Sequence, residues 1–154
     1  MEDTQINLDD DLRLAAQNGK IKAVEGLILS GANIHAFDEV QMTALHYAVQ
    51  GRNRQLVHWL IKQGADVNSH NADYAGETPL SLAAENGDFG IAKLLLGLGA
   101  NPYVKGWMWN DALDRAEKRK DSKGDMIRDL ILREHPPTKE RLKRDYKRER
   151  KTKS

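Results

Sequence analysis

The chain contains a stretch, Glu77-Thr78-Pro79-Leu80-Ser81-Leu82-Ala83-Ala84-Glu85-Asn86-Gly87, that predicts a helix with both ends marked. Thr78 can cap the first turn with its hydroxyl, and Pro79 suits the first helical position, where its missing N–H costs nothing. The leucines and alanines that follow recur at helical spacing, and the alanines are small enough to admit a close neighbour. Gly87 supplies the left-handed residue that ends many helices.

A second helix and a stop follow this stretch. Ile91-Ala92-Lys93-Leu94-Leu95-Leu96 has a second apolar face, and Gly99-Ala100-Asn101 ends it. The same succession of two helices and a glycine stop occurs twice upstream. Its Gly-Ala-Asn/Asp stops begin at residues 31, 64 and 99, so they are separated by 33 and 35 residues.

A period near 33 residues, with a start similar to T-P-L-H-x-A, resembles the ankyrin repeat. The resemblance covers roughly residues 8 to 133. It implies an all-α solenoid of about four stacked helix-turn-helix units with short hairpin loops, in which the first and last repeats are degenerate caps. We expect a flexible lead-in at 1–7, a repeat domain at 8–137 (repeats at about 8–37, 38–72, 73–105 and 106–135) and a basic tail at 138–154, disordered or helical.

The first repeat is expected to begin at three consecutive carboxylates. Asp9, Asp10 and Asp11 stand where the first helix should start, where acidic side chains complement the helix dipole. They also make this repeat polar, as the end of a stack requires. This interpretation is favoured over a metal site, because three adjacent carboxylates on a helix cannot all face one ion.

The second repeat departs from the pattern at its mid-repeat glycine. That position falls on Arg52, and Gly51 lies one residue earlier. Either the turn shifts by one residue or Arg52 tolerates the strained conformation. By resemblance, His46 bonds hairpin backbone and is structural, and Trp59 falls at a core leucine position and should pack inside.

The last repeat is the least regular. Residues 110–116 replace the T-P-L-H-like start, and a second helix is expected at 125–132 after a polar turn at 120–124. Pro136 and Pro137 end the domain, since neither can continue a helix.

The segment Gly106-Trp107-Met108-Trp109 is the strongest functional indication. By resemblance, Trp107 and Met108 occupy variable hairpin-tip positions that contact partners. Tryptophan is enriched among binding hot spots, and methionine adapts to recognition surfaces. Trp109 replaces the structural hairpin glycine, and we expect it to fold back over the final repeat.

The concave face implied by the same resemblance is mildly acidic, which suits a protein or peptide partner better than a phosphate backbone. The longer loop at 69–76 places Tyr74 near a tip. The expected binding residues are Trp107, Met108, Asn110, Tyr74, Glu77, Glu39, Val40, Met42, Gln50, Glu85, Asn86, Lys118 and Arg119, with Gln17 and Asn18 from the first repeat.

The net charge of +1 conceals a division between body and tail. Residues 139–154 carry nine basic and three acidic side chains, so this segment is +6 and the preceding 138 residues are −5. The basic residues are Lys139, Arg141, Lys143, Arg144, Lys147, Arg148, Arg150, Lys151 and Lys153. The tail is either solvated or helical, with Thr138 as a cap and with Leu142 and Tyr146 on one face.

Catalytic motifs do not appear in the sequence. It has no glycine-rich phosphate loop, H-E-x-x-H motif or nucleophile elbow, and its five histidines are dispersed. The absence of cysteine excludes disulfides and thiolate zinc sites. We therefore expect no enzyme, no cofactor and no bound metal. No apolar run reaches the roughly 18 residues of a membrane span, and no apolar leader is visible.

The sequence thus predicts a non-catalytic protein-binding module, acting as scaffold, adaptor or inhibitor, and a monomer rather than an oligomer. An intracellular location is expected, in the cytoplasm or alternatively the nucleus, or in a host cell if the source is microbial or viral. The alternative function is a nuclear or nucleic-acid-associated regulatory factor that acts through the basic tail. Steeply salt-dependent nucleic-acid binding would identify that alternative.

Overall fold

The structure is a computed structural model that describes residues 2–74 and 76–143. These residues form helices joined by turns and loops, with no strand among them. The bounded elements are α1 (Glu2–Gln17), α2 (Ile21–Leu29), α3 (Ala44–Gln50), α4 (Arg54–Lys62), the 3-10 turn η1 (Ala72–Tyr74), α5 (Pro79–Asn86), α6 (Phe89–Gly97), the 3-10 turn η2 (Trp107–Trp109), α7 (Ala112–Arg119) and α8 (Ser122–Glu134). Residues 139–143 are also helical.

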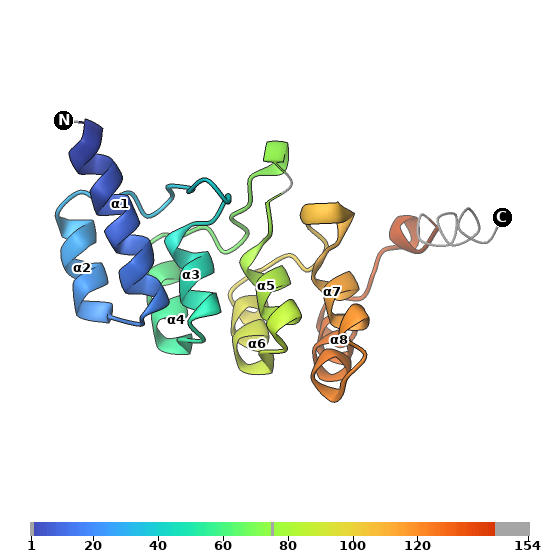
Figure 1. Cartoon of the computed structure of the whole chain (residues 1–154). Helices are drawn as coiled ribbons and strands as arrows, with labels where there is room; N and C mark the ends of the chain where they lie inside the picture. Colours follow the sequence, from blue (N-terminus) through green and yellow to red (C-terminus); the bar gives the residue numbers. More distant parts are fainter. Residues whose placement is uncertain (1, 75, 144–154) are drawn as a thin grey trace.

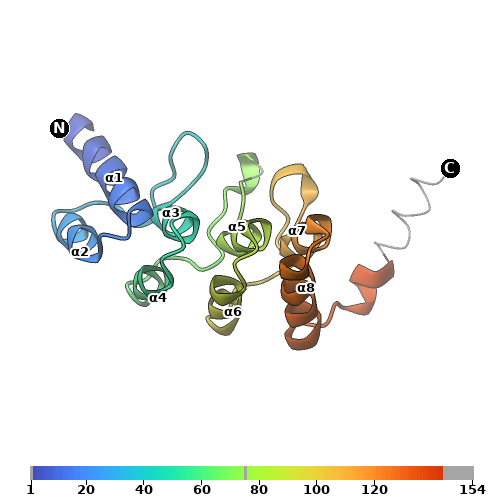
Figure 2. The same cartoon turned by 60° about the horizontal axis from the view of Figure 1, so that its bottom comes forward.

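The helices stand in antiparallel pairs that follow one another in chain order (Figure 1). Helices α1, α3, α5 and α7 pack against one another as the inner layer, and α4, α6 and α8 pack side by side in the outer layer. Figure 2 shows the two layers, with the loops between pairs projecting past the inner helices. The predicted all-α solenoid is therefore confirmed.

The ends of α5 follow from the sequence around it. The Thr78 hydroxyl oxygen accepts a hydrogen bond from the Ser81 backbone N–H at 3.0 Å, and Pro79 is the first helical residue. Gly87 ends the helix with a φ of +66°. The capping hydroxyl and the left-handed glycine thus satisfy backbone groups that the helix leaves open at its two ends.

Alanines bring the inner helices close together. Ala16, Ala48, Ala83, Ala84 and Ala116 are all essentially inaccessible to solvent. Leucine and isoleucine side chains from both layers fill the remaining space in one continuous core. Because each repeat buries its apolar face against the next, the stack is stable only as a row.

His46 links the second repeat to the third. Its Nδ1 accepts from the Thr43 backbone N–H at 3.0 Å, and its Nε2–H donates to the Glu77 carbonyl oxygen at 2.8 Å. The ring is completely buried, and burial lowers its pKa to about 4. The structural role implied for His46 by the resemblance is therefore what the geometry shows.

The turn within the second repeat does not shift. Arg52 has a φ of +54°, matching Gly19 and Gly87 at the same place in their repeats, and Lys120 does the same in the last repeat. Gly51 has an ordinary negative φ but no room for a side chain, because a Cβ there would lie 2.1 Å from the Gln17 carbonyl oxygen. The glycine serves close packing, and Arg52 carries the strained backbone.

Helix α1 begins at Glu2, so the predicted start of the first helix at Asp9 is wrong. Asp9 lies inside the helix, where its carboxylate accepts the Asn33 backbone N–H at 2.6 Å instead of capping a helix end. Asp10 pairs with Arg13 one turn on. These carboxylates therefore act through side-chain contacts, to the following loop and along the helix.

The position of Trp59 and the turn before α8 also differ from the prediction. Trp59 is half-buried against the core rather than inside it. The polar turn predicted at 120–124 is shorter, because the Asp121 carboxylate accepts the Gly124 backbone N–H at 2.8 Å and starts α8 at Ser122.

Replacing Arg52 by glycine should raise the free energy of unfolding by about 0.5–1 kcal/mol, because glycine removes the left-handed strain but loses more chain entropy. Urea denaturation measures the change. Lys20→Gly, at a φ of −82°, is the matched control and should bring no gain. Equal effects of the two substitutions would contradict the assignment of strain to Arg52.

His46 should make stability depend on pH. The unfolded chain takes up a proton near pH 6.5, whereas the folded ring does so only near pH 4. The neutral His46 ring therefore makes its full contribution to the free energy of unfolding above pH 6.5. As the pH falls from 6.5 to 4, the free energy of unfolding decreases by about 3 kcal/mol. Denaturation of wild type and His46→Gln across this range should show the loss in wild type alone. His58→Gln, at an exposed position, should behave as wild type.

Candidate protein-binding surface

The loop between α6 and α7 carries three large apolar side chains into solvent. Trp107, Met108 and Trp109 form η2, and their exposed fractions are 57%, 62% and 73%. An apolar group of this size is unusual on a monomer surface unless it meets a partner.

The backbone of this tip is fixed. Met108 and Trp109 have φ values of +56° and +58°. The Trp109 N–H donates to the Gly106 carbonyl at 3.1 Å, and the Gly106 N–H donates to the Asn110 carbonyl at 2.9 Å. A Cβ on Gly106 would lie 3.0 Å from the Gly76 carbonyl oxygen, so the tip also packs tightly on the preceding loop.

The prediction that Trp109 folds back over the last repeat is wrong. The residue of this tip that turns inward is Asn110, which is 5% exposed. Its Oδ1 accepts from Lys118 Nζ at 2.6 Å, and its Nδ2 donates to the Trp107 carbonyl at 3.4 Å. Asn110 and Lys118 are thus engaged in holding the tip, and Trp109 keeps the left-handed turn of the glycine it replaces.

Exposed apolar side chains also stand on the two preceding tips. Tyr74, in η1, is 70% exposed, and Val40 is 67% exposed beside the exposed Glu39. Asn71 Nδ2 donates to Gln41 Oε1 at 2.7 Å and so ties these two loops together. Three consecutive loops therefore present apolar groups along one edge of the stack (Figure 1).

The predicted surface of the inner helices is partly taken up by internal ion pairs. Glu77 pairs with Arg115, which also lies 3.3 Å from Glu85 through Nη1. Burial raises the pKa of Glu77, and the positive charge of Arg115 opposes that rise. Arg119 donates to the Glu85 carbonyl and pairs with Asp121. Glu77 and Arg119 are therefore bridges between repeats.

Other predicted positions remain open to solvent. Gln50 and Glu85 are exposed, and Met42 and Asn86 are half-buried. Gln17, at the end of α1, and Asn18, which follows it, are both exposed.

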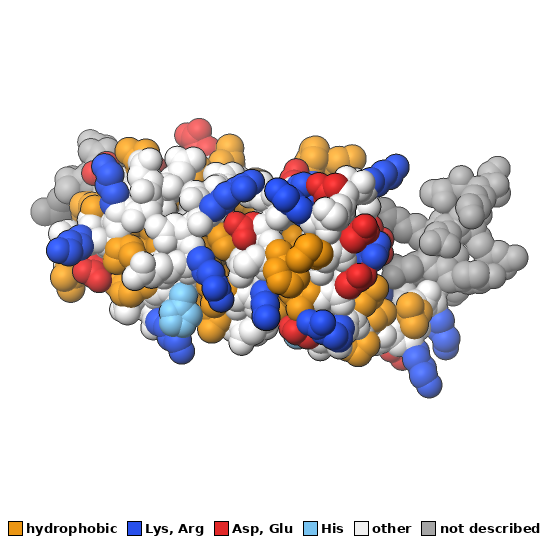
Figure 3. Space-filling view, turned by 90° about the horizontal axis from the view of Figure 1, so that it is seen from below, with side chains coloured by type: hydrophobic (Ala, Val, Ile, Leu, Met, Phe, Trp, Pro, Cys, Tyr) orange, Lys and Arg blue, Asp and Glu red, His pale blue; other side chains and the backbone are white. Residues whose placement is uncertain are grey.

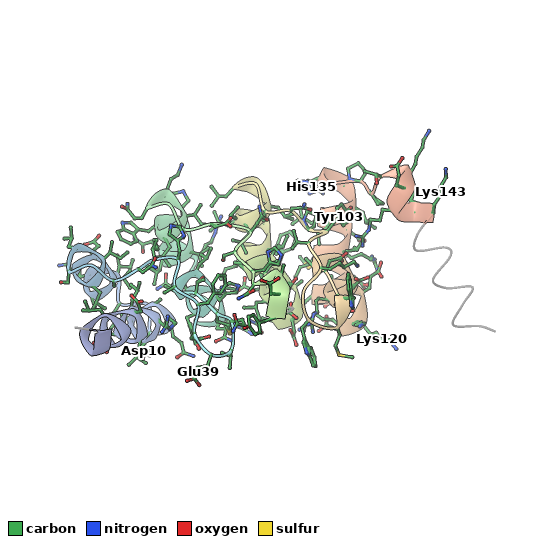
Figure 4. The ribbon with its side chains drawn as sticks, turned by 90° about the horizontal axis from the view of Figure 1, so that it is seen from above. Asp10, Glu39, Tyr103, Lys120, His135 and Lys143 are labelled. Carbon is green, nitrogen blue, oxygen red and sulfur yellow. The ribbon has the colours of Figure 1, made fainter. Side chains whose placement is uncertain are left out.

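A cavity of about 670 Å³ lies between α1 and the loop that precedes α3. It is lined by Asp9, Asp10, Arg13, Phe37, Asp38, Glu39, Val40 and Tyr47. Asp10 and Glu39 lie on the same edge of the molecule in Figure 4. Four carboxylates, one arginine and an aromatic wall suit a basic side chain better than an anion.

The polar groups of this cavity are held by specific bonds. The Tyr47 hydroxyl donates to Asp38 Oδ2 at 2.6 Å, and burial raises the pKa of Tyr47 to about 12. Sequence reasoning identified Glu39 and Val40 but missed Phe37, Asp38 and Tyr47. Phe37 and Asp38 could have been predicted, because they directly precede the expected tip residues Glu39 and Val40 in the sequence.

Neither a metal-ligand cluster nor a membrane-spanning helix occurs among the residues that the structure describes. No three His, Asp or Glu side chains among residues 2–74 and 76–143 are placed to hold a metal ion. Among the same residues, no helix is both long and apolar enough to cross a bilayer.

Basic side chains do not form a stripe on the face seen from below. Figure 3 shows Lys and Arg separated by apolar and uncharged surface, with acidic side chains among them. A phosphate backbone is bound by a continuous basic track, which this face lacks. Of the predicted basic tail, Lys139 and Lys143 are exposed and Arg141 is buried. Arg144, Lys147, Arg148, Arg150, Lys151 and Lys153 lie outside the described residues.

Comparison with known proteins gives a family match. A model described as ankyrin repeats (3 copies) matches residues 12–106. The chain is 34% identical over 113 residues to the putative ankyrin repeat protein R664 of Acanthamoeba polyphaga mimivirus, covering 68% of each chain. It is 33% identical over 93 residues to the putative ankyrin repeat protein L271 of the same virus, which is 56% of this chain and 12% of L271.

A third relative is much longer. The ankyrin repeat and KH domain-containing protein mask-1 of Caenorhabditis elegans is 36% identical over 101 residues, which is 66% of this chain and 4% of mask-1. The chain therefore spans two thirds of R664 and a small part of the other two relatives.

Removing the Arg115 side chain should leave the Glu77 carboxylate half-buried without its cation. Arg115→Gln should lower the free energy of unfolding at pH 7 by about 1–3 kcal/mol. The loss should shrink as pH falls through the raised pKa of Glu77, because the protonated carboxyl no longer needs the charge. Arg128→Gln, which removes exposed pairs with Asp125 and Asp129, should leave stability nearly unchanged. A pH-independent loss in Arg115→Gln would contradict this account.

Proposed function

The chain belongs to the ankyrin-repeat family, whose repeats mediate protein–protein interaction, and we propose that this protein binds a protein partner along the edge formed by its loop tips. The observation that carries the proposal is the row of exposed apolar side chains at Val40, Tyr74 and Trp107–Trp109. In this proposal the protein performs no chemistry and acts as a scaffold, adaptor or inhibitor.

The tips are suited to binding because their backbones are already fixed. Hydrogen bonds close the turn that holds Trp107 to Trp109, and Gly106 packs against the loop before it. Association then orders little more than the side chains, and this lowers its entropic cost. Tryptophan side chains have only two χ angles, so they bring large contact area with little loss of freedom.

Charge favours a partner with basic or neutral contact residues. The body of the chain, residues 1–138, carries a net charge of −5, and the cavity near α1 places four carboxylates beside Val40 at the first apolar tip. Complementary charge would raise the rate of association and fix the register of the partner. The partner side chain that fits the cavity is a lysine or an arginine.

The second candidate function is contact with nucleic acid through the basic tail. Its support is the +6 charge of residues 139–154. This binding would weaken steeply with salt, whereas a partner held by apolar tips would stay bound. We also propose that the protein acts as a monomer inside cells, in the cytoplasm or the nucleus. Because two relatives are proteins of a virus, the cell in this proposal is a host cell.

Affinity capture with the full chain tests the proposal. Substituting Trp107, Met108 and Trp109 by alanine should reduce capture of the partner by about tenfold or more, because buried anchors dominate binding. The matched control substitutes Leu29 and Met126, which are 89% and 50% exposed on α2 and α8. The control should capture as wild type does.

Two outcomes would contradict the proposal. Capture that is equal in the tip variant and wild type would remove the tips from the site. Captured material that disappears with nuclease and with rising salt, but survives the tip substitutions, would support the tail as the functional arm instead. Circular dichroism of each variant separates loss of binding from loss of the fold.

A further inference from the structure

One arginine of the segment that follows α8, Arg141, packs against the last repeat. Lys139, Glu140, Leu142 and Lys143 are exposed, but Arg141 is only 7% exposed. Residues 139–143 form a helical turn that begins at Thr138, whose Oγ1 accepts the Arg141 backbone N–H at 3.3 Å. One buried arginine in an exposed basic segment indicates a specific contact.

The arginine lies against two groups of the last repeat. Its Nη1 is 2.6 Å from Asp111 Oδ2, and the side chain of Asp111 is inaccessible to solvent. Its guanidinium carbon lies 4.2 Å from the centroid of the Tyr103 ring. A planar cation over an aromatic face, with a carboxylate nearby, is a geometry that arginine satisfies and lysine does not.

Both groups are positioned by contacts that do not involve the segment 139–143. Asp111 caps α7, accepting the Asp114 N–H at 3.0 Å, and its other oxygen lies 2.6 Å from Lys105 Nζ. The Tyr103 hydroxyl donates to the His135 carbonyl at the end of α8. Figure 4 shows Tyr103 and His135 near each other at the base of the segment, with Lys143 beyond them.

The charges of this cluster balance when the arginine is in place. Asp111 and Asp114 are matched by Lys105 and Arg141, and Lys105 pairs with both carboxylates. Without Arg141, one negative charge would remain uncompensated around a fully buried carboxylate, which is unfavourable. A second cation therefore stabilises the site.

We propose that Tyr103 and Asp111 form an arginine-binding site on the last repeat, and that residues 138–143 are its ligand within the same chain. Arg141 latches this segment to the end of the stack. The exposed Lys139 and Lys143 are thereby held beside the last repeat, so an acidic ligand that they bind is brought to that end of the molecule. This inference does not depend on the partner of the loop tips.

Amide hydrogen exchange of the full chain tests the latch. In Arg141→Ala, the Leu142 amide, which donates to the Thr138 carbonyl at 3.1 Å, should exchange about tenfold faster or more. Arg141→Lys keeps the positive charge beside Asp111 but lacks the planar guanidinium, and should lose most of the same protection. Arg133→Ala, a neighbouring arginine with a 71% exposed side chain, is the matched control and should exchange as wild type does.

Unchanged exchange in both Arg141 variants would overturn the latch. Equal acceleration throughout α7 and α8 would also overturn it, because the segment would then be an inseparable part of the repeat. Acceleration that appears only on dilution would show that the site holds the arginine of a second copy instead.

Binding in trans tests the chemistry of the site. A peptide of residues 136–143 should bind full-length Arg141→Ala, with shifts of the Tyr103 ring resonances in the NMR spectrum. The wild-type chain should bind it about tenfold more weakly or worse, because its own arginine competes at high effective concentration. The same peptide with lysine at position 141 should bind poorly to the variant. Equal binding of the two peptides would show a nonspecific cation contact and would overturn the arginine-binding site.

Discussion

The close approach of the inner helices is the constraint on which the rest of the molecule depends. Alanines at the facing positions and Gly51 against the Gln17 carbonyl let the helices stack backbone to backbone. His46 then reaches from one repeat to the Glu77 carbonyl of the next. This spacing explains why a side chain at position 51 is excluded while a strained arginine is accepted beside it. An unfavourable φ costs about 1–2 kcal/mol, whereas a blocked helix contact would separate two repeats.

A stack held in this way leaves its loops free to differ. Side-chain caps satisfy the backbone at the starts of α4, α5, α6, α7 and α8, as Thr78 does for α5, so the loop tips are not needed to cap these helices. The tip at Trp107–Trp109 shows the result, since two residues with positive φ and three exposed apolar side chains persist on a rigid base. Strain and exposure together cost stability, and binding is a physical reason for keeping them.

Local rules were enough to predict most of the fold. Thr78, Pro79 and Gly87 marked α5 correctly because a cap and a left-handed residue depend on near neighbours. The sequence could not predict that Asn110 and not Trp109 turns inward, because that depends on Lys118 eight residues away. The start of α1 at Glu2 was missed for a similar reason, since the Asp9 carboxylate caps the backbone of Asn33 rather than its own helix. The ion pair of Glu77 with Arg115, 38 residues apart, left no local trace in the sequence.

Long-range contacts also decide which side chains are open to a partner and which are already engaged within the molecule. Asp111 and Asp9 are both carboxylates near a helix, but Asp111 is fully buried between Lys105 and Arg141, whereas Asp9 lines an open cavity. Arg141 and Arg133 are both arginines, yet Arg141 is buried against Tyr103 and Arg133 extends into solvent. Residue type alone therefore overstates the binding surface of a repeat protein. What a partner can contact is the set of side chains left over once the bridges between repeats have been made, and here that set is apolar at the tips and acidic beside the first of them.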